Sequence, residues 1–347
     1  MLGRTILRFL VGAATILAVV GDTSGHEHKK PVIPHDGDNI LWTDPGDSSL
    51  LDFEFGAGGS ARRPQPPYRF VTEDESGTSP KINVKDDQGV SWNIKFGEEA
   101  NPSTFCTRLV WACGYFVPTE YFVERGRIEG THGLIRAKDY VSQDGAFVNG
   151  RFQLRSDSPK YLPDQGWTWL DNPFVGTHEL QGLKILMLLV SDWDTKDARD
   201  FVTVPHKGLQ MDSNLVIFAD DTTGERRYLY SNDDWGASMG RWGNVFARSK
   251  WDCLGFAEQT RHFAELLDDG TIEWSFHGKH SKDITTNIGI SDVQWLLHYL
   301  GRITDEQIRR GLVASGATSP QTECYTRALR QRIQQLEHIA AKGREGG

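Results

Sequence analysis

The amino-acid sequence predicts a mixed α+β fold in which a β-rich part is followed by a mostly helical part. Short segments of alternating apolar and polar residues, separated by turns rich in Gly and Asp, fill residues 68–96 and are typical of strands. After Gly236, apolar residues recur at helical spacing and capping residues precede them. We find no internal repeat, so we expect the β-rich part at residues 67–135 and the mostly helical part at residues 136–347.

The composition is that of a globular protein with a substantial core. The 347 residues are 38% hydrophobic and 24% charged, and they include 11 Trp, so one large domain or two modest ones are expected. The net charge of −9 argues against a nucleic-acid partner, because surfaces that bind nucleic acids are basic.

The first residues have the features of an export signal. Arg4 and Arg8 form a positively charged start, and the apolar segment 9–20 follows them. This segment is shorter than the roughly 20 residues that cross a bilayer. We therefore expect a cleaved signal peptide at residues 1–21, no stable membrane span, and a periplasmic or extracellular mature protein.

Residues 22–66 are rich in Gly, Pro, Asp and His and show little periodicity, which is typical of a flexible arm. An exported chain can form disulfides among its four Cys. However, Cys106 and Cys113 lie about 10 Å apart along a predicted helix, which is beyond disulfide reach. We expect these two Cys to be buried thiols.

The β-rich part begins with three expected strands, at residues 68–71, 82–85 and 90–96. The stretches 75–81 and 86–89 contain turn-forming residues and are expected to connect these strands. A helix is then expected over residues 104–113, with Pro102 near its start and Gly114 near its end. Residues 121–123 and a hairpin around Asn149-Gly150 add strands, because Asn-Gly favours tight hairpin turns.

Helices dominate the second part. Thr177 is a favourable N-cap for a helix that runs to Val190 and is apolar nearly all round, so this helix is expected to be central and buried. The stretch 220–224 is expected to be a hairpin turn. Further helices are expected at residues 293–300, 304–312 and 321–341.

Lys95 is the first candidate for chemistry. In the expected strand 90–96, alternation puts the apolar side chains on one face and Lys95 on the other. A lysine at this place can contact ATP phosphates, whereas a lone lysine on a strand is more often exposed to solvent. Glu98 and Glu99 follow just before the expected helix, and one of them could pair with Lys95. The small residues Gly77, Thr78 and Ser79, two strands earlier, could present backbone N–H groups to a phosphate.

Three acidic or amide side chains in the second part are further candidates. Asp194 and Lys196 have the spacing in which Asp accepts a proton from a nucleophile and Lys balances charge on the transferring group. Asp192 and Asp197 flank Asp194 and are potential metal ligands. A solvated acidic turn is the less favoured alternative for this stretch.

The other two candidates precede and follow strands. Asn214 opens the apolar segment 214–218, and an amide oxygen there is a potential metal ligand. Asp234-Trp235-Gly236 follows the strand-like segment 227–230 and has the order acid, aromatic, glycine of a metal-binding turn. A plain β-turn is the alternative, because these residue types are common in turns.

Taken together, residues 68–240 resemble the protein-kinase-like superfamily, in particular its atypical and uncharacterised bacterial members. Four stretches carry the resemblance: Gly77-Thr78-Ser79-Pro80-Lys81, Trp92-Asn93-Ile94-Lys95, Trp193-Asp194-Thr195-Lys196-Asp197 and Asp234-Trp235-Gly236. The resemblance implies a two-lobed fold, with a β-rich N-lobe and a mostly helical C-lobe, and ATP with Mg²⁺ or Mn²⁺ between them. It also implies that Lys95 contacts the phosphates, Asp194 is the catalytic base and Asp234 binds the metal.

The sequence departs from the superfamily pattern at two places. Arg199 stands where a metal-binding Asn is expected, so Asn214 takes that role only if residues 198–213 are an insertion. The expected helix 104–113 contains no acidic residue that could pair with Lys95.

Two alternative functions follow from these observations. A kinase-like fold that has lost catalysis would act as a secreted binding module. A haloacid-dehalogenase-like phosphatase would use Asp192-Trp193-Asp194 after an apolar run, with Asp220-Asp221 after an apolar strand. It predicts repeated βαβ units, however, which the sequence does not show. The acceptor substrate of a phosphoryl or nucleotidyl transfer is not identified by any motif.

Overall fold

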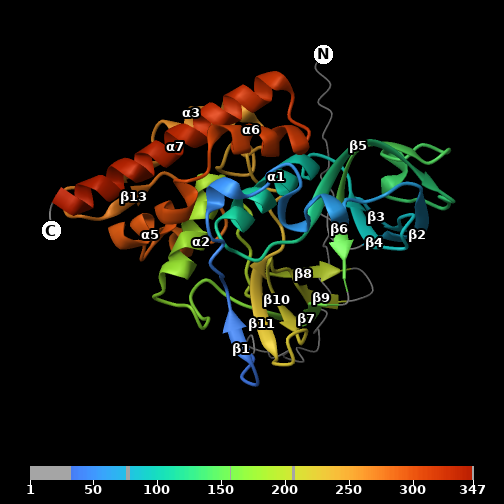
Figure 1. The fold of residues 1–347 in the computed structure, drawn as a ribbon, viewed down its shortest axis with the longest axis horizontal. Coiled ribbons are helices and arrows are strands. Elements are labelled where there is room, and N and C mark those ends of the chain that lie inside the picture. Colours follow the sequence, from blue (N-terminus) through green and yellow to red (C-terminus); the bar gives the residue numbers. More distant parts are fainter. Residues whose placement is uncertain (1–32, 76–78, 157, 205–207, 346–347) are drawn as a thin grey trace, which may run out of the picture. The chain divides into compact units, whose positions relative to one another are not determined.

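The structure, a computed structural model, describes residues 33–75, 79–156, 158–204 and 208–345. Within these residues the chain combines several β-sheets with helices α1 to α7, which confirms the predicted mixed α+β class (Figure 1). The predicted signal peptide at residues 1–21 lies outside the described residues.

Five strands close into a barrel, seen at the right of Figure 1. In pairing order they are β2 (Tyr68–Asp74), β3 (Lys81–Lys85), β4 (Ser91–Lys95), β6 (Ala146–Arg155) and β5 (Glu120–Glu129). The expected alternation along β4 is confirmed. Trp92 and Ile94 belong to the apolar core of the barrel, while the Lys95 ammonium forms ion pairs with residues outside that core.

A second sheet lies beside a larger apolar core. It has the strand order β1-β11-β10-β7, with β1 (Asp38–Ile40), β11 (Arg227–Asn232), β10 (Leu215–Asp220) and β7 (Lys160–Gly166). Helix α1 (Ala100–Ala112) follows the barrel strand β4 and packs into this larger core. The expected turn at residues 220–224 is confirmed, because β10 and β11 pair antiparallel on either side of it.

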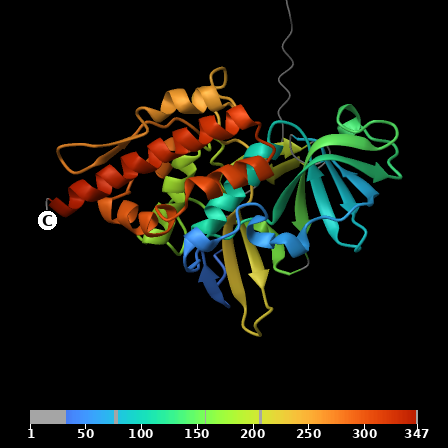
Figure 2. The same cartoon turned by 45° about the horizontal axis from the view of Figure 1, so that its top comes forward.

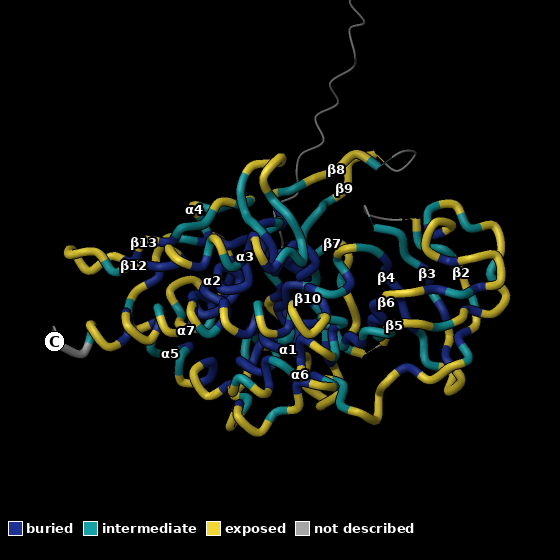
Figure 3. The backbone as a smooth tube through the Cα atoms, turned by 90° about the horizontal axis from the view of Figure 1, so that it is seen from above, coloured by how far each residue is buried: buried dark blue, intermediate teal, exposed yellow. Residues whose placement is uncertain are grey.

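Helix α2 (His178–Leu189) is buried along most of its length, as expected, and Figure 3 shows its dark blue backbone among other buried segments. Thr177 is its N-cap and accepts a hydrogen bond from the backbone N–H of Leu180, which confirms that prediction. The remaining helices are α3 (Cys253–Thr260), α4 (Ser281–Thr285), α5 (Ile290–Leu300), α6 (Asp305–Ala314) and α7 (Ser319–Glu345). The long helix α7 runs past helices α2, α3, α5 and α6 (Figure 2).

Two antiparallel strand pairs complete the fold. Strands β8 (Phe201–Val204) and β9 (Gly208–Met211) follow the acidic loop after α2. Strands β12 (Ala264–Leu266) and β13 (Ile272–Trp274) lie between α3 and α4 in the chain.

The expected hairpin turn at Asn149-Gly150 is wrong. Both residues lie inside β6, whose pairing with β5 continues past them, and the turn region is residues 130–145 instead. Asn149 has a positive φ of 56°, which Asn tolerates better than most residues, so the dipeptide marks an irregularity within a strand. Consequently the barrel extends to Arg155, beyond the boundary expected at residue 135.

The stretch interpreted as a flexible arm is packed where the structure describes it. Strand β1 pairs in parallel with β11, and the side chains of Leu41 and Phe53 are buried in the larger core. The guanidinium of Arg108 on α1 donates to the carbonyl oxygens of Phe53 and Glu54. This packing could not be predicted from composition, because the segment has little regular secondary structure and therefore no periodic pattern of apolar residues.

The cysteines follow the expectation from spacing. Cys106 and Cys113 are free and buried, whereas Cys253 and Cys324 form a disulfide that joins α3 to α7. A disulfide is compatible with an exported protein. In the described part of the chain, no helix is both long and apolar enough to cross a membrane.

Candidate active site

Three of the predicted site residues meet in one charged cluster. The Lys95 ammonium lies 2.8 Å from Glu99 Oε2 and 3.3 Å from Asp234 Oδ2. Lys95 and Asp234 are 139 residues apart in the chain, so the tertiary fold alone brings them together. Burial alone would lower the pKa of Lys95, but the carboxylates of Asp234 and Glu99 outweigh it and raise that pKa.

Local structure explains how Glu99 reaches Lys95. Strand β4 ends at Lys95, Gly97 adopts a positive φ of 93°, and Glu99 is the N-cap residue of α1. The chain therefore turns sharply between strand and helix and brings the carboxylate back over the lysine. The acidic partner of Lys95 is thus Glu99, one of the two glutamates expected as possible partners, and it lies just before the helix and not within residues 104–113.

Asp234 is held in place by the turn that follows β11. Its Oδ1 accepts a hydrogen bond from the backbone N–H of Gly236 at 2.9 Å. A Cβ atom at Gly236 would lie 2.7 Å from the Cβ of Glu99, so only glycine allows this close approach. Trp235 is fully buried and packs in the larger core, as expected for the aromatic residue of this turn.

Lys250 completes the charged cluster, which we define as Lys95, Glu99, Lys250 and Asp234, and Ser79 contacts it. Lys250 Nζ lies 2.5 Å from Glu99 Oε1, and Ser79 Oγ donates to Glu99 Oε2 at 2.8 Å. Burial would raise the pKa of Glu99, but Lys95 and Lys250 hold it well below its usual range. Gly77 and Thr78, predicted beside Ser79 as phosphate contacts, lie outside the described residues.

The loop after α2 carries the other predicted residues. Lys196 Nζ lies 3.1 Å from Asp194 Oδ2 and 3.2 Å from Asp212 Oδ2. The amide nitrogen of Asn214 donates to the Asp194 carbonyl at 2.5 Å, and the Asn214 carbonyl accepts from the backbone N–H of Asp233 at 2.9 Å. Asn214 therefore links the Asp194 loop to the Asp234 turn.

Backbone hydrogen bonds also join these two segments. Trp193 N–H donates to the Ala237 carbonyl, and Met239 N–H donates to the Val190 carbonyl. Between them lies Asp192, fully buried, with Oδ1 accepting from the backbone N–H of Asp194. Burial and the negative charges of Asp194 and Asp234 raise the pKa of Asp192 well above its usual range. The carboxylates of Asp194 and Asp234 therefore both lie close enough to Asp192 to raise its pKa.

Asp197, predicted as a metal ligand, has other partners. With His280 and Asp283 it forms a group whose potential ligand atoms lie within 4.8 Å of one another. However, the Arg199 guanidinium lies 2.5 Å from a carboxylate oxygen of both Asp197 and Asp283. A cation thus already pairs with both carboxylates of this group, and Arg199 at the expected Asn position serves in these ion pairs.

A buried arginine, Arg332, contacts the start of the Asp194 loop, and no motif in the sequence indicated it. Arg332 on α7 donates from Nη1 to the Leu189 carbonyl and to Ser191 Oγ, each at 2.8 Å. These are the end of α2 and the start of the Asp194 loop, where backbone carbonyls lack partners within the helix. Burial without a carboxylate partner lowers the pKa of Arg332 to about 9. Its position on the apolar face of α7 was the available sequence signal.

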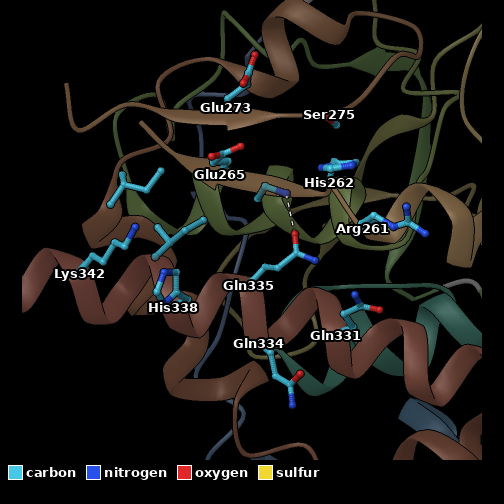
Figure 4. Close-up of a pocket in the computed structure, with 13 residues that line it drawn as sticks. Arg261, His262, Glu265, Glu273, Ser275, Gln331, Gln334, Gln335, His338 and Lys342 are labelled. Carbon is cyan, nitrogen blue, oxygen red and sulfur yellow. Dashed lines mark hydrogen bonds between the residues drawn. The ribbon is translucent and has the colours of Figure 1, made fainter. Parts of the chain in front are cut away.

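The described pockets lie away from the charged cluster. One of about 480 Å³ lies between α7 and the β12–β13 pair, where Figure 4 shows polar side chains such as His262, Glu273 and His338 around it. A second, of about 760 Å³, is lined by β5, α6 and the N-terminal stretch. None of the predicted site residues lines either of these two pockets.

Comparison with known proteins gave no match to a family model, to a curated protein or to a solved structure.

Proposed function

We propose that this protein is an exported, atypical kinase-like enzyme that transfers a phosphoryl or nucleotidyl group from ATP with the help of Mg²⁺ or Mn²⁺. The observation that carries the proposal is the contact of Lys95 with both Glu99 and Asp234. A lysine held by one carboxylate, next to a second carboxylate on a glycine turn, is the arrangement that phosphoryl transfer uses for phosphates and metal.

The order of the elements supports the proposal. A small β-barrel supplies Lys95, a buried helix leads into the Asp194 loop, and two antiparallel strands then lead to Asp234. A two-lobed, protein-kinase-like fold has the same sequence of parts. Under the proposal, the barrel is the N-lobe, and α2 with the elements after it belongs to the C-lobe.

The surroundings of the candidate residues suggest a role for each of them in the proposed transfer. Lys95 would bind phosphate oxygens, with Glu99 holding its side chain in position. Asp194, partly exposed and beside the Lys196 ammonium, would accept the proton of the attacking hydroxyl as a general base. Lys196 would offset negative charge that develops on the transferring group.

The residues present fit a hard divalent cation. Carboxylate and amide oxygens are the ligands that Mg²⁺ and Mn²⁺ prefer, and Asp234 and Asn214 offer them within one hydrogen-bonded unit. When bound, the cation neutralises phosphate charge and orients the triphosphate. Lys95 also contacts the Asp234 carboxylate, so the proposed phosphate and metal sites adjoin.

A catalytically inactive binding module is the second candidate. The observation that favours it is Arg199, which occupies the expected place of a metal-binding Asn and is committed to Asp197 and Asp283. The phosphatase alternative has less support, because helix α2 precedes Asp192, where a phosphatase of that kind would have a strand.

The test is transfer from ATP labelled at the α- or γ-phosphate, with Mn²⁺ or Mg²⁺. The wild type is compared with Asp194→Asn and Asp234→Asn, and the exposed Asp269→Asn serves as control. We expect the wild type and the control to release or transfer label, and both site variants to lose at least about 100-fold in rate. Binding of Mn²⁺–ATP without turnover in the wild type would favour the binding module. Equal rates for all four proteins would overturn the proposal.

A further inference from the structure

The cavity between α7 and the β12–β13 pair has a polar helix face as one wall. Gln331, Gln335, His338 and Lys342 of α7 line it, and they recur every three or four residues, so they share one face of the helix (Figure 4). The volume of about 480 Å³ falls within the range of about 300–1,000 Å³ that is usual for ligand sites. Because a polar helix face is often simply solvated, the opposite wall decides what this cavity can bind.

The opposite wall includes the free edge of β12. Phe263 and Leu267, just before and after β12, form backbone hydrogen bonds with the residues that flank β13. Because bonded and non-bonded pairs alternate along antiparallel strands, the N–H and C=O groups of Ala264 and Leu266 point away from β13. The Ala264 N–H agrees with this direction, since it donates to Oε1 of Gln335 on α7 at 3.2 Å (Figure 4). Both Ala264 and Leu266 line the cavity.

This edge has backbone groups without partners. Within the described part of the chain, the Leu266 N–H and the carbonyl oxygens of Ala264 and Leu266 form no hydrogen bond. An unpaired strand edge is a template for pairing with another chain. Gln335 accepts from the Ala264 N–H and donates from Nε2 to the Thr260 carbonyl, so it closes one end of the edge and leaves Leu266 open.

Two glutamates face the cavity beside this edge. Glu265 and Glu273 pair in register across β12 and β13, so their side chains share one face of the sheet, with Cβ atoms about 4.5–5.5 Å apart, and both line the cavity. Like charges directly opposite each other destabilise a sheet. Arg261 and Lys342 also line the cavity, but no cation of the described residues lies within ion-pair distance of either glutamate. A cationic group of a ligand would therefore be stabilised next to them.

We propose that this cavity binds an extended peptide segment of another protein, which adds as a strand to the free edge of β12 and places a Lys or Arg side chain against Glu265. Main-chain hydrogen bonds to such an edge supply affinity, and alternate side chains supply specificity. On an added strand, about 4.8 Å away, the residue opposite Glu265 lies on the same face as both glutamates. The polar side chains of α7 would line the other side of the peptide. The inference is independent of the proposed function, because none of the predicted site residues lines this cavity.

The test begins with random peptides of about ten residues, displayed on phage and selected against the immobilised full chain. Enriched peptides are synthesised, and their affinity is measured by fluorescence anisotropy for the wild type, for Glu265→Gln combined with Glu273→Gln, and for Asp268→Asn. Asp268 is exposed in the turn of the same hairpin and does not line the cavity. We expect enriched peptides to contain Lys or Arg, the double variant to bind them at least about 10-fold more weakly, and Asp268→Asn to bind them as the wild type does.

Methylation of single backbone nitrogens of the best peptide tests strand addition directly. Successive N–H groups of a strand point to opposite sides, so we expect binding to be lost at every second position and kept at the positions between. Thermal unfolding of the double variant is recorded in parallel and should show no loss of stability, since two opposed like charges are removed. Selection of no peptide, equal binding by the wild type and the double variant, an equal loss in Asp268→Asn, or methylation losses without a two-residue period would each overturn the inference.

Discussion

At the scale of single residues, Glu99 connects segments that are distant in the chain. One of its oxygens contacts Lys95 at the end of the barrel strand β4, and the other contacts Lys250, after the Asp234 turn. Gly236 packs against the same side chain without room for a Cβ atom. Glu99 therefore sets the distance between Lys95 and Asp234, which is the geometry on which the proposed chemistry depends.

The contribution of Glu99 to stability should depend on pH. Its pKa in the folded state lies below the value of 4.5 for an unperturbed Glu, so its ionised form stabilises the fold above that pH. This stabilisation is lost as the pH falls through the lower, folded-state pKa. We expect the difference in free energy of unfolding between the wild type and Glu99→Gln to shrink by about 2 kcal/mol from pH 7 to pH 3.

Urea unfolding at the two pH values measures this difference. The exposed Glu98→Gln, one residue earlier, is the matched control and should show almost no pH-dependent difference. A difference for Glu99→Gln that is equal at both pH values would contradict the ion pairs with Lys95 and Lys250.

At the scale of elements, the Asp194 loop depends on helix α7. Arg332 donates to the end of α2 and to Ser191, and it also donates to Thr260 Oγ1 and the Phe256 carbonyl on α3. One side chain thus ties α2, α3 and α7 together beneath the loop. Ser191, which has a positive φ of 57°, lies at the point where the loop leaves the helix.

Replacement of Arg332 by Met should destabilise the fold by about 2–4 kcal/mol, because buried carbonyl groups lose their donors. Arg327→Met, on the exposed side of the same helix, changes the same charge and should have an effect near zero. Thermal and urea unfolding measure both effects. Similar stabilities for the two variants would show that the Arg332 contacts do not hold the loop in place.

At the scale of the whole molecule, the disulfide between Cys253 and Cys324 closes a segment of 71 residues between α3 and α7. In the chain-entropy model, a closed loop of this length stabilises the folded state by about 4 kcal/mol. We expect Cys253→Ser with Cys324→Ser to lower the urea midpoint strongly and to make stability insensitive to reductant. A wild type whose unfolding is unchanged by reductant would contradict a structural disulfide.

Much of the fold could be predicted from local pattern, and long-range packing explains the rest. The strands around Val84 and Ile94 and the buried helix after Thr177 followed from alternation, turns and capping. The packing of residues 38–66 did not, because contacts of Leu41 and Phe53 with distant helices leave no periodic signal.

In the candidate site, too, some residues could be predicted from local pattern and others depend on long-range packing. Lys95 and Asp234 could be selected from their strand and turn contexts, and the structure brings them together. Lys250 and Arg332 were not selected, because no motif surrounds them and their partners lie 151 and 141 residues away in the chain. Asp197 was selected as a metal ligand from its place in the motif. The sequence does not show that its carboxylate pairs with Arg199.

The most direct test of the account is a calorimetric titration with Mn²⁺–ATP of the wild type, Lys95→Gln, Asp234→Asn and the double variant. We predict that the wild type binds, that each single change weakens binding at least about 10-fold, and that the double variant loses little more than either one, because the two side chains act on one ligand. Wild-type affinity in both single variants, or no binding by the wild type, would contradict the central claim that Lys95 and Asp234 form a metal–triphosphate site.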